Sequence, residues 1–237
     1  MHFSWFQRIG FRSGVEGASP LILPVYKQLK AWRKAKSKMG WGIRQEEFDR
    51  IEAPSPLTER DLREGFDGVA LFYGFGDDGL GNSDSVLSGK MAWDYARKRQ
   101  RGRTWQCEYV DFDEADRIRL RPGAQPRPKG FYFANIRTGQ SDPSLTVSQV
   151  RKRFDRRTGF GPEGIQLTAI THPHFQDMMN ERKIPFMALA DYDVAPYGFH
   201  DFFDAAQLFC SSDVFGLGIG NVDRNYPLFG IPTLRLQ

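Results

Sequence analysis

One stretch constrains the fold of this chain more than any other: the apolar run at residues 184–190 (IPFMALA), which leads into Asp191-Tyr192-Asp193. An apolar run of this length between polar segments is typical of a strand that is buried on both faces. Such strands occur mainly in parallel sheets, where ligands bind outside the carboxyl ends of the strands. The run therefore predicts a buried parallel strand that brings two carboxylates to the edge of a sheet.

The segments around this run alternate between strand-like and helix-like patterns. Alternation at this spacing predicts crossover units on a parallel sheet. We therefore expect an α/β fold with a Rossmann-like parallel core in residues 128–237, helices on both faces of its sheet, and an N-terminal basic α+β extension in residues 1–127 that adds a strand or two. The core pattern consists of strands at 131–136, 164–170, 184–190 and 214–219, and of helices at 145–157, 174–182 and 199–209.

The aspartates at the end of the apolar run suggest a metal site. Asp191 and Asp193 are two residues apart, so both carboxylates of an extended strand point to the same side. Two close carboxylates repel unless a cation or a proton lies between them, and Mg²⁺ prefers oxygen ligands. We therefore predict that both aspartates bind magnesium, with His200 as an acid or base at the start of the next helix. Alternatively, one aspartate caps the following turn and the other is solvated.

The histidines allow a second metal hypothesis. His172 and His174 flank a proline, and with His200 they place three of the four histidines at the predicted sheet edge. Imidazoles in such a set are typical ligands of a catalytic zinc. A turn set by Pro173, followed by a helix that begins at His174, explains the same residues without a metal.

Basic residues form three clusters, at residues 27–38, 97–103 and 151–157, although the chain as a whole carries only +4. Clustered Lys and Arg attract phosphate backbones, and such binding weakens as salt increases. DNA or RNA is therefore the predicted partner, while solvated helix faces, or a phospholipid surface for residues 27–38, are the alternatives. The candidate phosphate contacts are Lys34, Arg99, Arg101, Arg137, Arg153 and Arg224.

The segment ADYDVAPYG at residues 190–198 resembles the D-x-D-P-x-G segment of Toprim domains, above all that of the type IIB topoisomerase A subunit and its meiotic double-strand-break relative. In that family two aspartates and a glutamate at the end of the first strand hold Mg²⁺ for phosphoryl transfer on nucleic acid. Asp191 and Asp193 match the two aspartates. The predicted first strand ends instead in Asn135 and Arg137, and two extra residues precede the proline.

Three functions are compatible with these patterns. The first is Mg²⁺-dependent, nuclease-like phosphoryl transfer or metal-dependent nucleic-acid binding, in which Arg137 and Arg224 contact phosphates. The second is a nucleic-acid-binding or assembly protein without catalysis, and the third is a zinc-dependent hydrolase. The chain has two cysteines, no apolar run of the ~20 residues that span a bilayer, and no signal-peptide pattern at its start. We therefore expect a cytoplasmic protein without a transmembrane segment, with homo-oligomerisation left open.

Overall fold

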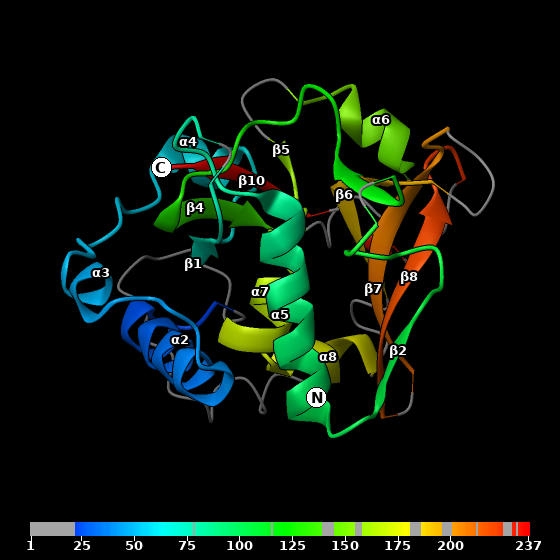
Figure 1. Cartoon of the computed structure of the whole chain (residues 1–237). Coiled ribbons are helices and arrows are strands. Elements are labelled where there is room, and N and C mark those ends of the chain that lie inside the picture. The colour runs from blue at the N-terminus through cyan, green and yellow to red at the C-terminus, as the bar shows by residue number, and fades with distance from the viewer. Residues whose placement is uncertain are drawn as a thin grey trace, which may run out of the picture.

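Two β-sheets pack against a central group of helices (Figure 1). The structure is a computed structural model. It describes residues 22–77, 79–114, 116–138, 145–154, 158–180, 186–195, 201–211, 213–224, 229–230 and 232–237. Within these ranges, no helix is both long enough and apolar enough to cross a bilayer.

The first sheet has the strand order β1-β4-β10-β5, and all of its pairings are antiparallel. Its longest ladder joins β1 to β4, where Gly68 lies opposite Ile136 and Gly74 lies opposite Gly130. The strands are β1 (Gly68–Gly74), β4 (Gly130–Arg137), β5 (Thr158–Gly159) and β10 (Thr233–Leu236).

The second sheet has the order β2-β8-β7-β6-β3, with β9 beside β6. The pairs β2–β8 and β6–β9 are parallel, and the other pairs are antiparallel. The strands are β2 (Thr104–Gln106), β3 (Ile118–Leu120), β6 (Phe186–Val194), β7 (Asp204–Ser211), β8 (Val214–Asn221) and β9 (Phe229–Gly230).

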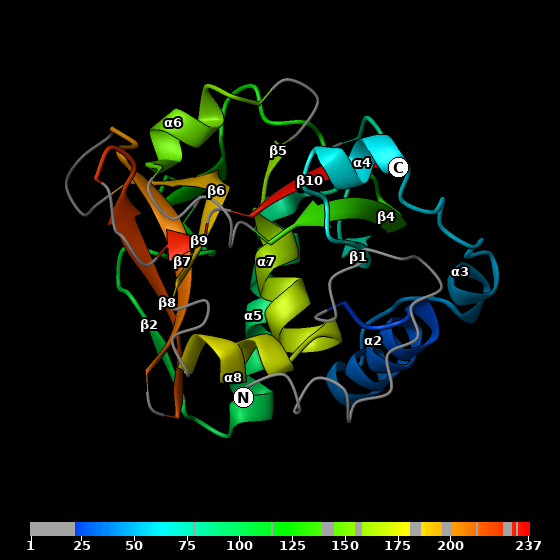
Figure 2. The same cartoon turned by 180° about the vertical axis from the view of Figure 1, so that it is seen from behind.

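The central helices α5, α7 and η1 lie between the two sheets, and α6 covers part of the outer side of the second sheet (Figures 1 and 2). The helices are α2 (Val25–Met39), α3 (Gln45–Asp49), α4 (Glu59–Arg63), α5 (Ser85–Gln100), α6 (Val147–Arg151), α7 (Pro162–Gln166), the π-helical turn η1 (Leu167–Thr171) and α8 (His174–Asn180).

The predicted Rossmann-like parallel core is wrong, because both sheets are mainly antiparallel. The apolar run at 164–170 forms α7 and η1 instead of a strand; short apolar runs do not distinguish a buried helix from a buried strand. The predicted helix at 199–209 contains most of β7. Without that helix as a crossover, β7 joins its neighbours as an antiparallel strand.

Other elements agree with the predictions from the sequence. The strands expected at 131–136 and 214–219 are present as β4 and β8, and the run at 184–190 lies in β6 from Phe186 onward. Strands from both sides of residue 127, where we placed the domain boundary, share each sheet: β1 pairs with β4, and β2 and β3 flank the strands β6 to β8.

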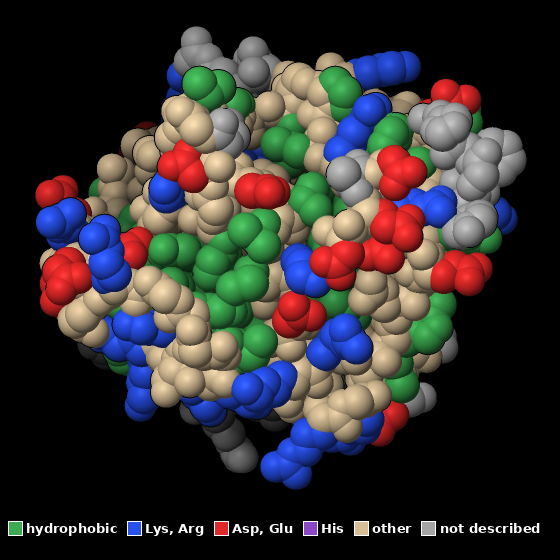
Figure 3. Space-filling model, viewed as in Figure 1, with side chains coloured by type: hydrophobic (Ala, Val, Ile, Leu, Met, Phe, Trp, Pro, Cys, Tyr) green, Lys and Arg blue, Asp and Glu red, His purple; other side chains and the backbone are tan. Residues whose placement is uncertain are grey.

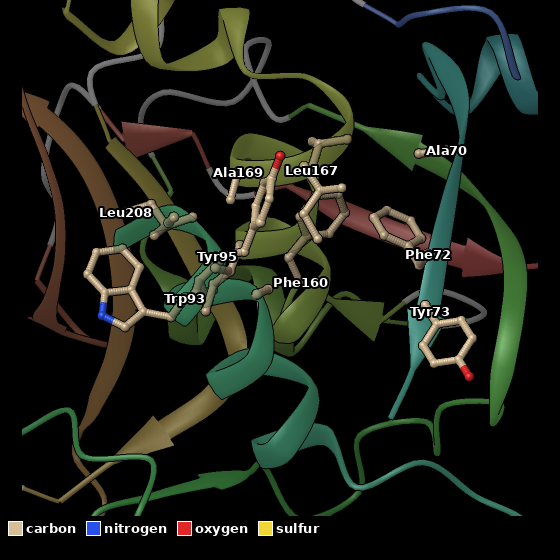
Figure 4. Packing of buried hydrophobic residues seen from close by; sticks show 14 of the residues in the cluster. Ala70, Phe72, Tyr73, Trp93, Tyr95, Phe160, Leu167, Ala169 and Leu208 are labelled. Atoms are coloured by element: carbon tan, nitrogen blue, oxygen red, sulfur yellow. The ribbon is translucent and has the colours of Figure 1, made fainter. Parts of the chain in front are cut away.

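Buried aromatic side chains fill the space between the sheets (Figure 4). Trp93 of α5 packs on Phe215 of β8 with ring centroids 5.6 Å apart, and Phe72 of β1 meets Phe160 edge-on at 6.2 Å. Burying a large apolar side chain contributes roughly 1.5–3 kcal/mol. One continuous core therefore holds both sheets and α5 in place.

Side chains, rather than another strand, close the outer edge of β1. Gln28 of α2 accepts a hydrogen bond from the Leu71 N–H (2.8 Å), and Gln166 of α7 exchanges two bonds with the backbone of Tyr73 (2.7 and 3.0 Å). Trp32 Nε1 also donates to the Leu71 carbonyl (3.1 Å). A glutamine amide offers a donor and an acceptor, as a peptide group does, so these side chains protect the edge from pairing. They also dock α2 with its lysines facing outward.

Candidate nucleic-acid interface

The two aspartates predicted as metal ligands lie at an irregular point of β6. Leu189 and Asp193 are four positions apart, yet they pair with adjacent residues of β7. The residues between them leave this ladder as a bulge, and the Asp191 N–H donates instead to the Phe160 carbonyl (3.0 Å). Bulges redirect side chains. The regular alternation that predicted a shared direction for both carboxylates therefore does not apply here.

Asp191 is fully buried and bonded to arginine. Arg127 Nη2 lies 3.0 Å from Asp191 Oδ2, and Arg127 Nε lies 2.6 Å from Glu163 Oε1; all three side chains are shielded from solvent. Arg121 Nη2 approaches Asp191 Oδ1 at 3.3 Å, and the Thr158 hydroxyl also donates to Asp191. Burial lowers the pKa of Arg127, but the Glu163 and Asp191 carboxylates outweigh it and raise that pKa above its ordinary value. The guanidinium is therefore held in its charged form.

This buried group connects the two sheets. Tyr132 of β4 donates to Glu163 Oε1 (2.8 Å), Glu163 lies in the first turn of α7, and Asp191 belongs to β6. Glycine at position 159 of β5 is required for the approach, because a Cβ there would lie 2.7 Å from the Cβ of Ala190. We call this group the Arg127 network; its members are Arg127, Tyr132, Thr158, Glu163 and Asp191.

Asp193 has an arginine partner of its own. Arg151 Nη2 donates to Asp193 Oδ1 (2.7 Å), and Arg151 Nε donates to the Ala190 carbonyl (2.7 Å). Burial raises the pKa of Asp193 above its ordinary value, although the Arg151 charge opposes the shift. This pair fixes α6 to the bulge in β6.

The arginines occupy the oxygen atoms that a magnesium ion would need. An ion bound to Asp191 and Asp193 would have to displace contacts from Arg127, Arg121 and Arg151. The described residues also contain no group of three or more His, Cys, Asp or Glu placed to hold a metal. The magnesium site stays a prediction, while the contacts favour a role for both aspartates in holding the fold.

Two of the three histidines predicted as zinc ligands, His172 and His174, lie near each other. The ring centroids of His172 and His174 are 5.7 Å apart, whereas His200 lies outside the described residues. His172 is fully buried, and its Nε2 accepts a hydrogen bond from the Leu23 N–H (2.7 Å). Burial, with the nearby His174, lowers the pKa of His172 well below its usual range. The neutral imidazole therefore uses this lone pair inside the protein.

The six basic residues predicted to contact phosphates do not form one surface. Lys34 and Arg101 are exposed on or beside α2 and α5, while Arg99 turns inward and donates to the Ala169 carbonyl (3.0 Å). Arg153 follows α6, at the opposite end of the molecule from the last turn of α5 (Figures 1 and 2). The other two lie elsewhere: Arg137 is the last residue of β4, and Arg224 follows the end of β8.

The last turns of α2 and α5 meet and form a single basic surface. Lys98 Nζ donates to the Lys38 carbonyl (2.6 Å), and Lys38 Nζ lies 3.4 Å from the Lys98 carbonyl. These reciprocal bonds satisfy carbonyls at two helix C-termini, whose dipoles favour positive charge. In Figure 3, Lys and Arg side chains gather along the lower edge, over α2 and the lower end of α5. We define the basic surface as Lys30, Lys34, Lys38, Arg97, Lys98, Arg101 and Arg103.

A strained turn shapes one end of the basic surface. Arg101 ends α5 in the left-handed conformation (φ 52°, ψ 45°), and Gly102 follows with φ 85°. Arg101 is the only non-glycine residue with positive φ in the part of the chain that the structure describes. Glycine is the usual residue at such a position. The turn reverses the chain into β2 and holds an exposed guanidinium beside the two helix ends.

A pocket of about 600 Å³ lies between the end of α5 and β2. Arg97 and Lys98 of the basic surface form one wall, and Thr104 and Gln106 of β2 form another. The remaining lining residues are Trp93, Asp94 and Gly102. The pocket is therefore polar, and cationic side chains of the basic surface stand at its wall.

Sequence reasoning identified the basic segments but missed the arginine partners of the aspartates. Arg121 and Arg127 belong to the Pro- and Arg-rich stretch at 121–129, which spans the boundary that we predicted after residue 127. They lie 70 and 64 positions from Asp191 in the sequence, so no local signal linked them to it. Glu163 gave none either, because it directly precedes the run at 164–170, which was interpreted as a strand.

No protein-family model matches the chain, and no curated protein or solved structure matches it. The resemblance of residues 190–198 to Toprim domains thus stays a prediction from one segment.

Proposed function

We propose that this protein binds nucleic acid through its phosphate backbone at the basic surface. The observation that carries the proposal is the junction of α2 and α5, where two basic helix ends from distant parts of the sequence meet through Lys38 and Lys98. The basic clusters predicted at 27–38 and 97–103 therefore act as one surface.

The charge on this surface is largely uncompensated. The sequence of α2 contains no Asp or Glu, and Lys30, Lys34 and Lys38 recur every four residues along one face. Among the residues that the structure describes, two ion pairs involve the basic surface: Arg97 lies 3.9 Å from Asp94, and Arg103 lies 3.2 Å from Asp213. Exposed pairs of this kind contribute little, roughly 0–1 kcal/mol. The surface therefore keeps a strong positive potential.

Many acidic residues lie away from this surface, although Asp94 and Asp213 pair with Arg97 and Arg103 on it. A group of them lies on the right of the face shown in Figure 3, while the basic side chains follow its lower edge. In the sequence, acidic residues concentrate in the segment before β3, which contains Asp111, Asp113, Glu114 and Asp116. This separation produces a field that steers a polyanion to one side of the molecule.

The spacing of the lysines suits a phosphate backbone. Lys30 and Lys38 are eight residues apart on α2, or roughly 12 Å along the helix axis. Successive phosphates of one strand rise by about 3.4 Å in B-DNA, so this distance covers three or four of them. The cations of α5 and its following turn extend the same track.

Fluorescence anisotropy with labelled oligonucleotides tests the proposal. We expect Lys34→Ala, Arg97→Ala and Arg101→Ala together to weaken binding at least tenfold at 100 mM salt, because three phosphate contacts are lost. The matched control removes three exposed cations elsewhere, Arg50, Arg63 and Lys152, each replaced by alanine. Equal losses in both triple variants would contradict a localised interface, as would an unchanged affinity in the first.

A further inference from the structure

The edge strand β2 presents an aromatic side chain beside the basic surface. Trp105 is 49% exposed and lies between Thr104 and Gln106, which line the pocket. Successive side chains of a strand point to opposite faces of its sheet. Trp105 therefore faces the outer side of the second sheet, while its two neighbours face the pocket and α5.

Trp105 begins a row of aromatic residues that crosses four strands. It pairs with Gly216 of β8, Gly216 pairs with Phe209 of β7, and Phe209 pairs with Phe186 of β6. The ring centroids of Trp105 and Phe209 are 5.6 Å apart, and those of Phe209 and Phe186 are 6.1 Å apart. The row thus runs without interruption from the edge strand β2 across β8 and β7 to β6.

Glycine at position 216 makes this arrangement possible. A Cβ there would lie 2.1 Å from Phe209 Cζ, so any larger residue would push the phenylalanine ring off β8. With glycine in place, the ring lies over β8 toward Trp105. The exposed indole is therefore supported from one side by a second ring, which restricts its motion without covering its outer part.

The basic surface and this row meet at the edge strand β2. Arg101 and Arg103 precede Trp105 in the chain, and the pocket between α5 and β2 joins Arg97 and Lys98 to the residues on either side of Trp105. Proteins that bind single strands combine a positive track for the backbone with aromatic side chains on which bases stack. Bases in a duplex are already paired and stacked, and they are not available to an indole at a sheet edge.

We propose that the ligand of the basic surface is a single strand of nucleic acid, with one base stacked on Trp105 and its phosphates along the helix ends. This inference rests on the proposed function and narrows its ligand class. Arg101 and Arg103 would bring the backbone around the edge of β2, and the stacked base would lie on the outer face of the sheet.

Binding of single-stranded and duplex oligonucleotides of equal length to the full chain tests the inference. We expect Trp105→Ala to weaken single-strand binding roughly tenfold, which is within the range measured for loss of one stacked base. Duplex binding should change less than about twofold, and Trp105→Phe should keep most of the single-strand affinity. Phe203→Ala is the matched control, because Phe203 is 54% exposed at the far end of β7, roughly 20 Å from Phe209 along the strand.

Tryptophan fluorescence gives a second readout. A base stacked on Trp105 should quench part of the emission when oligo-dT is added, and Trp105→Phe should lose that quenching while it still binds. Equal affinity for single-stranded and duplex oligonucleotides, with no effect of Trp105→Ala, would overturn the inference. The proposed function would stand in that case if the Lys34→Ala, Arg97→Ala, Arg101→Ala variant binds more weakly than the wild-type chain. Absence of salt-sensitive binding to either form would overturn both.

Discussion

Arg127 and Arg97 carry the same guanidinium group in opposite surroundings. The Arg127 side chain is fully shielded and bonded to Glu163 and Asp191, whereas 61% of the Arg97 side chain is exposed and its ion-pair partner Asp94 lies 3.9 Å away. Taking a charge out of water costs several kcal/mol, so a buried arginine persists only with well-placed partners. An exposed arginine keeps its hydration and remains available to an external anion. The comparison separates arginines that hold this fold from those that can bind a ligand.

The buried side of the comparison predicts the largest effect. Replacing Arg127 with methionine would leave Glu163 and Asp191 buried without a countercharge, and we expect the free energy of unfolding to fall by about 3–5 kcal/mol. Arg97→Met should change it by less than about 1 kcal/mol. Urea unfolding of both variants measures the difference. Similar small losses would show that the Arg127 network does not hold the two sheets together.

The pH dependence of stability tests another buried polar group. Burial and the nearby His174 lower the pKa of His172 in the folded protein. Above pH ~6.5 the imidazole is therefore neutral in both the folded and the unfolded chain. Below that pH the unfolded chain binds a proton, whereas His172 of the folded chain stays neutral. Stability should therefore fall as the pH decreases, by up to about 2 kcal/mol between pH 6.5 and 5. In His172→Gln, whose amide oxygen can accept the Leu23 N–H, this part of the loss should vanish. Identical pH profiles would refute the assignment.

Arg101 allows a test of an exposed arginine in which stability and binding should change in opposite directions, because its backbone is strained. Left-handed backbone costs residues with a Cβ about 1–2 kcal/mol, and glycine relieves the strain while increasing the entropy of the unfolded chain. We expect Arg101→Gly to raise the unfolding free energy by about 0.5–1 kcal/mol and to weaken nucleic-acid binding about two- to fivefold. Thermal unfolding and anisotropy provide the two readouts. A variant that is both less stable and fully active in binding would contradict the account.

Magnesium provides the test with the smallest expected effect. Because arginines occupy the Asp191 and Asp193 oxygens, we expect about 10 mM Mg²⁺ to shift the unfolding temperature by less than about 1 °C relative to Na⁺ at equal ionic strength. A larger stabilisation that disappears in Asp193→Asn would restore the metal-site hypothesis for these aspartates.

Local sequence patterns predicted individual elements better than their partners. The apolar run at 184–190 is a buried strand from Phe186 onward, as its composition indicated. Its bulge was not predictable, because there the Asp191 carbonyl accepts a hydrogen bond from the Arg121 N–H and the Asp191 N–H donates to the Phe160 carbonyl, and both partners lie far away in the sequence. The run at 164–170 carried no periodicity that distinguishes a buried helix from a strand. The run at 164–170 therefore forms a helix where a strand was predicted, and residues 199–209 contain most of a strand where a helix was predicted. Without that helix as a crossover, neighbouring strands pair mainly antiparallel instead of parallel.

The candidate site shows the same limit. Lys34 and Arg101 were found from charge clustering, but the contact between Lys38 and Lys98 joins residues 60 positions apart and becomes visible only in the fold. Trp105, two positions after the cluster at 97–103, could have been found from the sequence as an aromatic residue next to cations. Asp191 was predicted to bind a metal, and its observed partner Arg127 lies 64 positions away in the sequence, so the buried ion pair between them could not be predicted.

The most direct test of the central claim is the salt dependence of single-strand binding by the wild-type chain and by the Lys34→Ala, Arg97→Ala, Arg101→Ala variant. Each phosphate contact on a single strand contributes roughly 0.7 to the slope of log affinity against log salt. The basic surface predicts that the magnitude of the slope decreases by about 2 in the variant, whose fold should be intact because the Arg127 network is untouched. Equal slopes in the two proteins would contradict the claim that this surface binds the phosphate backbone.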